Sequence, residues 1–143
     1  MTTTTIRKIL GGRPLHSISS KLSLRGAAEV MAHNGVGAVA VTDGEDLVGI
    51  LTERDIVFRG VARGLPADDT PSAEVMTRDP VTVQIDDAIS DALAAKLGDA
   101  FRHLPVMEDG RIVGLLSYRD IPPEYVMMFE HFREMSSARA DDV

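Results

Sequence analysis

The chain repeats itself at a fixed interval. Residues 47–56 read LVGILTERDI and residues 112–121 read IVGLLSYRDI, so six of the ten positions are identical at an offset of 65 residues. The same offset pairs apolar residues upstream, for example Ile18 with Val83 and Val41 with Val106. Because self-similarity at one period is the signature of a repeated structural unit, we expect two copies of one fold.

Each copy shows the same order of predicted elements. An extended piece (16–19; 81–85) precedes an amphipathic helix (23–34; 88–100), then two apolar strands around an Asp-Gly turn (38–41 and 47–51; 104–107 and 112–116), then a final helix (55–63; 120 onward). Asp86 or Asp87 is the expected cap of the second amphipathic helix. A copy of about 60 residues is marginal alone. We therefore predict an α+β fold of two β-α-β-β-α repeats, packed sheet to sheet about a pseudo-twofold axis with two related crevices.

The expected boundaries follow the repeat. The first repeat covers 1–64, a polar linker rich in Pro and Asp covers 65–72, the second repeat covers 73–124, and a C-terminal helix with a frayed tail covers 125–143. Short helical turns at 6–10 and 73–76 lead into the first and second copy. The tail places apolar residues from Tyr125 to Met135 on one helical face. An uncovered apolar face predicts a homodimer.

Composition excludes several classes of protein. The net charge of −7 and the absence of a basic block argue against nucleic-acid binding, which draws much of its affinity from Lys and Arg. Without cysteine there are no disulfides, thiolate nucleophiles or cysteine–metal sites. No run of 18 apolar residues predicts a membrane span. We expect a cytoplasmic protein without membrane association.

A motif closes each copy and carries a family resemblance. Gly49-Ile-Leu-Thr52-Glu-Arg-Asp55 and Gly114-Leu-Leu-Ser117-Tyr-Arg-Asp120 both follow Gly-x-x-Thr/Ser-x-x-Asp, after a hairpin and before a helix. In that position, and in register twice, the motif resembles the cystathionine-β-synthase-type (CBS) repeat. The resemblance implies a stand-alone Bateman module that senses a ligand and regulates an unidentified effector protein. The implied regulatory ligand is an adenosine-containing nucleotide (AMP, ADP, ATP, NAD(H) or S-adenosylmethionine), with no other cofactor.

The resemblance and the chemistry of the motif give a set of candidate site residues. A carboxylate at a helix start suits the two ribose hydroxyls, and a neighbouring hydroxyl near free helix N–H groups suits a phosphate or ribose oxygen. Backbone of the adjacent strands would read the adenine edge. The candidates are Ala38, Val39, Thr52, Arg54, Asp55, Thr82, Arg102, His103, Leu104, Pro105, Ser117, Arg119 and Asp120. Since Arg102-His103 stands where the first copy has Gly37-Ala38, we expect the second crevice to favour anions.

Simpler interpretations stay open beside these. Asp55 and Asp120 have an alternative role as helix N-caps, Thr52 and Ser117 as residues bonded to local backbone, and the arginines as solvated side chains. The sequence offers no nucleophile–base pair, so we assign no enzymatic activity. The four histidines lie too far apart in sequence to predict a metal site. The alternative function is an interaction or oligomerisation module with degenerate, empty crevices.

Overall fold

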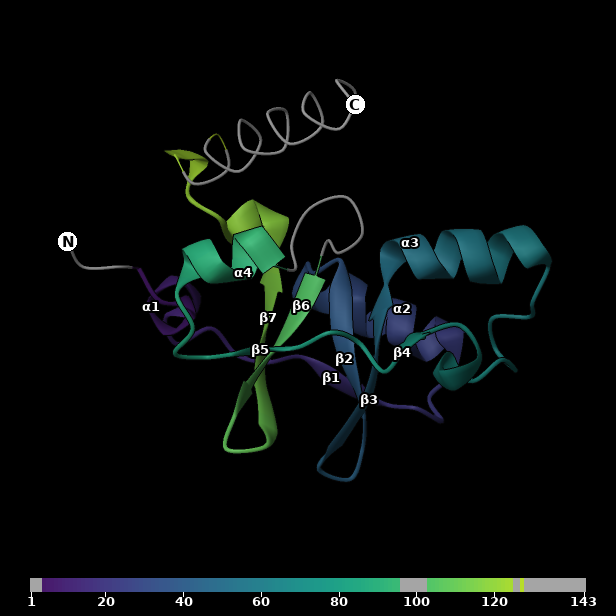
Figure 1. The fold of residues 1–143 in the computed structure, drawn as a ribbon. Coiled ribbons are helices and arrows are strands. Elements are labelled where there is room, and N and C mark those ends of the chain that lie inside the picture. The colour runs from purple at the N-terminus through teal and green to yellow at the C-terminus, as the bar shows by residue number, and fades with distance from the viewer. Residues whose placement is uncertain (1–3, 96–102, 125–126, 128–143) are drawn as a thin grey trace, which may run out of the picture.

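The structure, a computed structural model, describes residues 4–95, 103–124 and 127 (Figure 1). In chain order the elements are α1 (Ile6–Leu10), β1 (Ser17–Ser19), α2 (Leu24–Asn34), β2 (Ala38–Asp43), β3 (Asp46–Thr52), α3 (Glu53–Asp55) with its continuations η1 (Ile56–Gly60) and η2 (Val61–Arg63), η3 (Ser72–Glu74), β4 (Thr77–Arg78), β5 (Val83–Gln84), α4 (Ile89–Ala95), β6 (His103–Glu108), β7 (Arg111–Ser117) and η4 (Tyr118–Asp120). Two β-hairpins hang side by side below the helices.

Two sheets with matching topology confirm the duplication. The first has the order β1-β2-β3-β4 and the second β5-β6-β7. In each sheet a parallel strand precedes an antiparallel hairpin. The hairpin registers shift between Val41 and Thr42 in the first copy, and between Val106 and Met107 in the second. These irregularities are also 65 residues apart, so the copies agree in backbone detail as well as in sequence.

Local chemistry explains most element boundaries. Ser23 caps α2, because its hydroxyl accepts from the Gly26 N–H at 3.1 Å, and Gly35 ends α2 in the left-handed region at φ +64°. The second hairpin turns at Asp109-Gly110, as predicted, with positive φ at both residues. The first hairpin turns one residue later than predicted, at Gly44-Glu45.

Two further predictions about helix ends are wrong. Neither Asp86 nor Asp87 caps α4: Asp86 bonds Arg7, and Asp87 accepts from the Gln84 N–H. The first N–H of α4 instead donates to the Thr4 carbonyl. The final helix of the second copy does not run onward from Asp120 but closes as the single turn η4, because two prolines follow and lack the N–H that would continue it.

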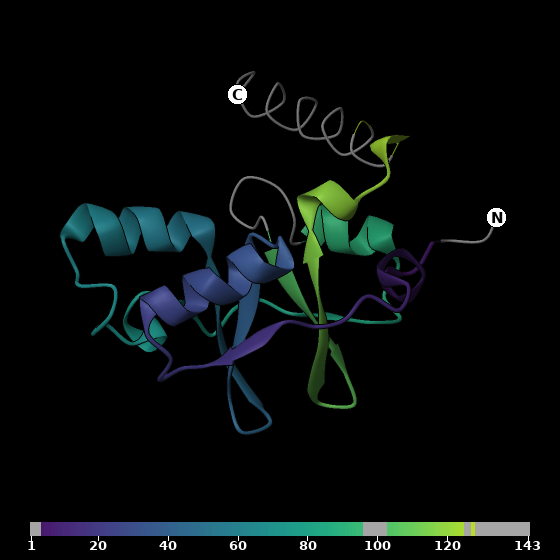
Figure 2. The same ribbon diagram turned by 180° about the vertical axis from the view of Figure 1, so that it is seen from behind.

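Each half buries a separate apolar core, and the halves exchange their lead-in helices. The core of the first sheet contains Val75 and Met76, which follow η3. The core of the second sheet contains Ile6 and Leu10 of α1. Figures 1 and 2 both place α1 next to α4 in the second half. Each lead-in thus precedes one copy in the chain and packs against the core of the other.

The sheets meet along one hairpin. β7 packs against both β2 and β3, which brings the two halves face to face as predicted for the α+β fold. The strand ends that carry the two motifs therefore approach a common space between the halves.

Candidate functional site

The first motif forms a reciprocal cap at the start of α3. Asp55 donates its backbone N–H to the Thr52 hydroxyl at 3.0 Å, and its Oδ2 accepts from the Thr52 N–H at 3.1 Å. This is a capping box, with Thr52 rather than Asp55 as the N-cap. Asp55 Oδ1 accepts no hydrogen bond from a described residue and lies 3.7 Å from Arg59 Nη1. The local role considered for Thr52, a bond to nearby backbone, is thus present, whereas Asp55 sits at the third helical position and not at the N-cap. One oxygen of its carboxylate is left over.

The second motif repeats the bond from the strand-end N–H to the carboxylate, with two differences: the N–H that reaches the hydroxyl, and the partner of Oδ1. Asp120 Oδ2 accepts from the Ser117 N–H at 2.8 Å, and Ser117 Oγ accepts from the Arg119 N–H at 3.2 Å. Asp120 Oδ1, however, accepts from Arg13 Nη1 at 2.7 Å. The hydrogen bond with Asp120 raises the pKa of Arg13 further above its ordinary value, so the guanidinium stays charged.

Both motif aspartates line a cleft of about 1340 Å³ between the halves. Its walls also carry apolar side chains, including Met31, Ile50 and Leu115. Single small-molecule sites occupy about 300–1,000 Å³, so the cleft has room for more than one such ligand. Mixed walls of this kind suit a ligand with a flat apolar part and a polar, charged part.

The structure places the predicted site residues in three groups. Eight line the cleft: Ala38, Thr52, Arg54, Asp55, His103, Ser117, Arg119 and Asp120. Four do not: Val39 and Leu104 are buried in the cores, Pro105 is fully buried, and Thr82 is half-buried beside the lining residues Pro80 and Val81. The backbone contacts to adenine proposed for Val39, Thr82 and Leu104 stay a prediction, as does the place of Pro105 in the site. Arg102 lies outside the described residues.

Several lining residues were missed by the sequence analysis. Arg13 and His16 come from the segment between α1 and β1, and Thr77 belongs to β4. None of them belongs to the repeated motif. The exchange of lead-in segments brings Arg13 and Thr77 to the cleft, whereas His16 is held beside β2 of its own half, because its carbonyl accepts from the Ala40 N–H at 3.0 Å. Arg54, which was predicted, lies with its guanidinium 4.5 Å from the centre of the Phe58 ring.

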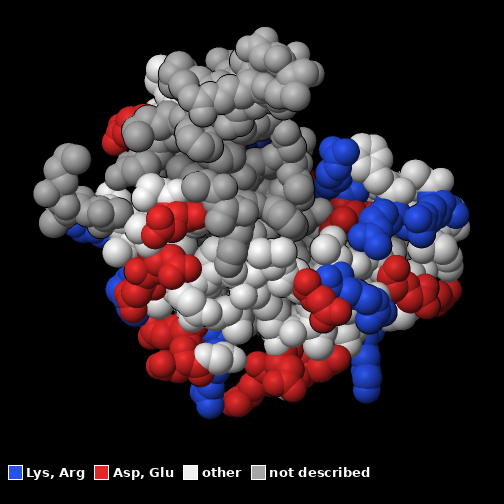
Figure 3. All heavy atoms as spheres, viewed as in Figure 1, with Lys and Arg blue, Asp and Glu red and all other residues white. Residues whose placement is uncertain are grey.

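Charge is unevenly distributed over the surface. In Figure 3 acidic side chains gather along the edge formed by the hairpin turns, whereas several basic side chains lie over the helix that begins with α3. Arg13, Arg54 and Arg119 line the cleft together with Glu53, Asp55 and Asp120. The described lining of the cleft therefore carries as many guanidinium groups as carboxylates, on a chain whose net charge is −7.

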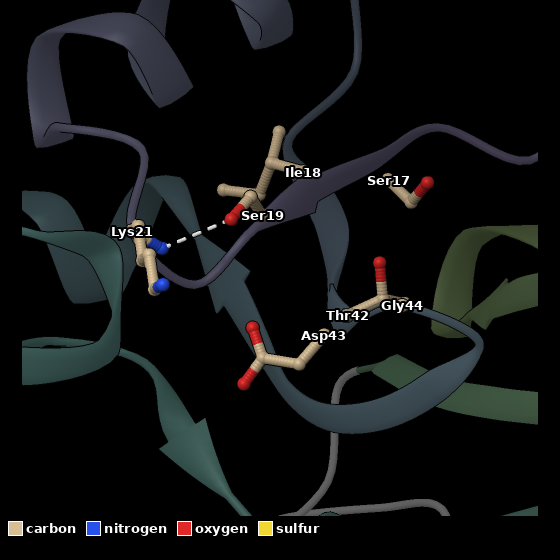
Figure 4. A pocket seen from close by; sticks show the side chains of 7 residues that line it. All are labelled: Ser17, Ile18, Ser19, Lys21, Thr42, Asp43 and Gly44. Atoms are coloured by element: carbon tan, nitrogen blue, oxygen red, sulfur yellow. Dashed lines mark hydrogen bonds between the residues drawn. The ribbon is translucent and has the colours of Figure 1, made fainter.

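A second hollow of about 590 Å³ lies away from the motifs. It is lined by Ser17, Ile18, Ser19, Lys21, Thr42, Asp43 and Gly44 (Figure 4). Ser19 Oγ accepts from the Lys21 N–H at 3.2 Å, and Asp43 accepts from Ser20, so its polar groups already bond each other. In the described part of the chain, no cluster of three His, Asp or Glu side chains is placed to hold a metal. Nor does any helix there have the length and apolar character to cross a membrane.

Comparison with known proteins agrees with this geometry. The family model described as CBS domain matches residues 6–61 and 72–121. The CBS domain-containing protein CBSCBSPB2 of Arabidopsis thaliana is 34% identical over 140 residues, which are 97% of this chain and 26% of that protein. The chain thus spans about a quarter of this curated relative.

Solved structures resemble the fold closely. A CBS-domain protein from Agrobacterium tumefaciens has a TM-score of 0.73 at 31% identity, covering 82% of this chain and 95% of that one. A CBS domain protein from Pyrobaculum aerophilum, solved in complex with AMP, has a TM-score of 0.76 at 27% identity, covering 90% and 99%. The chain belongs to the CBS domain family and carries two repeats, which form a module of a generally regulatory, ligand-binding kind.

Proposed function

We propose that this protein is a non-catalytic sensor that binds an adenosine-containing nucleotide in the cleft and passes its occupancy to an effector protein. One observation carries the proposal. Each repeat holds a motif carboxylate at the same cleft by an N–H of its own strand end, and guanidinium groups stand nearby. Carboxylate acceptors beside guanidinium cations match a ribose joined to phosphate.

The cleft offers a partner for each part of the ligand. Asp55 Oδ1 is available to a ribose hydroxyl, and the apolar walls suit the faces of adenine. Arg54 and Arg119 suit phosphate oxygens. The AMP found in the Pyrobaculum protein supports an adenosine ligand here, and AMP is the first of the candidates to test, before ADP, ATP, NAD(H) and S-adenosylmethionine.

Replacing the motif aspartates tests this proposal. Each of Asp55→Ala and Asp120→Ala removes a charge-assisted contact of about 1.5–3 kcal/mol, so each should weaken AMP binding at one site about 10- to 100-fold in isothermal titration calorimetry. Ser23→Ala is the matched control, because it removes a helix cap outside the cleft and costs ~1 kcal/mol of stability without touching the ligand. Unchanged AMP binding in both folded aspartate variants would contradict the assignment.

The alternative is an interaction module whose cleft stays empty. A thermal-shift panel separates the two, because a ligand at 100 times its Kd stabilises the protein by about 2.7 kcal/mol. Failure of every adenosine ligand to raise the Tm would favour the alternative.

We further propose that the protein forms a homodimer through the helix that begins with α3. Val57, Phe58 and Val61 are each more than half exposed on it and lie close together along the helix. Exposed apolar groups that are clustered in this way mark interaction surfaces. The tail from Tyr125 to Met135, which the sequence analysis chose for this role, lies outside the described residues except for the exposed Met127.

A further inference from the structure

The two motif aspartates differ in whether their Oδ1 already accepts a hydrogen bond. Both use Oδ2 to accept from their own strand-end N–H. The Oδ1 of Asp120 also accepts a hydrogen bond from Arg13 at 2.7 Å, whereas the Oδ1 of Asp55 has only Arg59 at 3.7 Å, beyond hydrogen-bonding distance. A ribose hydroxyl that reaches Asp55 finds an available oxygen. One that reaches Asp120 must compete with a guanidinium.

Arg13 is well placed to respond to that competition. It lies in the segment 11–16, which crosses from α1 in the second half to β1 in the first. Its side chain is 49% exposed, against 16% for Asp120, and both residues line the cleft. Among the described residues, Asp120 is the hydrogen-bond partner of the guanidinium, which leaves further N–H groups for a second anion.

We propose that Arg13 makes the second motif site selective for ligands that carry a phosphate, whereas the Asp55 site, whose Oδ1 is available, also binds nucleosides. This inference rests on the proposed nucleotide-binding function. A neutral nucleoside that takes Oδ1 of Asp120 leaves Arg13 without its anion. A nucleotide replaces that anion with its own phosphate, which a guanidinium can bind through two parallel N–H groups.

Binding of adenosine and AMP to the full chain tests the proposal by calorimetry. We expect AMP to bind at two sites, and adenosine to bind one site at concentrations where the second remains empty. Arg13→Ala frees Asp120, so the affinity of the second site for adenosine should rise about 5- to 30-fold, and two adenosine molecules should bind per chain. The affinity of the same site for AMP should fall by a comparable factor. The ratio of the AMP and adenosine affinities at this site should therefore fall.

Two further variants keep the test decisive. Arg25→Ala is the matched control, because it removes the exposed ion pair with Asp68 outside the cleft, and the affinity ratio should not change. Arg13→Gln can still donate a hydrogen bond to Asp120 but carries no charge, so it should lower the affinity for AMP more than it raises the affinity for adenosine. An unchanged ratio in both Arg13 variants, with AMP still bound, would overturn this inference alone. Absence of AMP binding to the unmodified chain would instead overturn the proposed function.

Discussion

The motif glycines, Gly49 and Gly114, mark where the exchanged segments cross the sheets. A Cβ at Gly49 would lie 2.7 Å from Met76 Sδ and 2.7 Å from the Thr77 carbonyl oxygen. A Cβ at Gly114 would lie 2.9 Å from Leu10 Cδ1. Each motif therefore begins with glycine because the lead-in segment from the other half packs directly on the strand. This role is independent of any ligand.

The two glycines should tolerate alanine differently. Gly49→Ala meets a backbone carbonyl that cannot move away, so we expect a loss of about 1–3 kcal/mol in the free energy of unfolding. Gly114→Ala meets the end of a flexible leucine side chain and should lose less. Gly12→Ala, with open space around its Cβ, is the control. Urea denaturation measures all three, and a Gly49 variant as stable as the control would refute the packing role.

At the scale of elements, α1 is held to the second half by polar as well as apolar contacts. The N–H groups of Ile6 and Arg7 donate to the carbonyls of Asp87 and Ile85. The Arg7 guanidinium bonds both Asp86 and Glu108, and its hydrogen bond lowers the pKa of Asp86. The bond to Arg7 stabilises the folded state only while Asp86 is charged. Its contribution to the free energy of unfolding is therefore lost in acid, as the pH falls through the lowered pKa of Asp86.

Weakening α1 should therefore destabilise the second half of the molecule, against which α1 packs, and not the first half, which α1 precedes in the chain. Ile6 is fully buried in the second core, so Ile6→Ala should cost about 2–5 kcal/mol. Hydrogen exchange should accelerate in β5, β6 and β7 before β1 to β3. Val75→Ala provides the reciprocal comparison, because Val75 is buried in the first core. Faster exchange in β1 to β3 of the Ile6 variant would contradict the exchange of lead-in helices.

The sequence predicted what depends on neighbouring residues. The duplication, the hairpins and the α2 stop at Gly35 follow from local patterns, as does the bond of Thr52 to nearby backbone. The exchange was not predictable, because the apolar face of Ile6 and Leu10 is the same whichever sheet it covers. Arg13 was missed for a similar reason: it stands in a segment without periodicity, and its partner is 107 residues away.

For the whole molecule, the exposed residues Val57, Phe58 and Val61 predict how the protein assembles. A charge placed among them should break the proposed homodimer, so Val61→Glu should sediment as a 15.4 kDa monomer at tens of micromolar while the unmodified chain sediments at twice that mass. Gln84→Glu, which adds the same charge to an exposed strand position, should leave the dimer intact. A monomeric unmodified chain would exclude this interface.

The exchange of lead-in helices also sets when the protein can fold during its synthesis. Arg7 and Asp86 are 79 residues apart, so at roughly 5–20 residues per second a ribosome makes the partner of α1 about 4–16 s after α1 itself. During that interval Ile6 and Leu10 have no sheet to cover, and the first sheet still lacks Val75 and Met76. A nascent chain paused after the first repeat therefore presents two unfinished apolar surfaces, and chaperones bind surfaces of that kind.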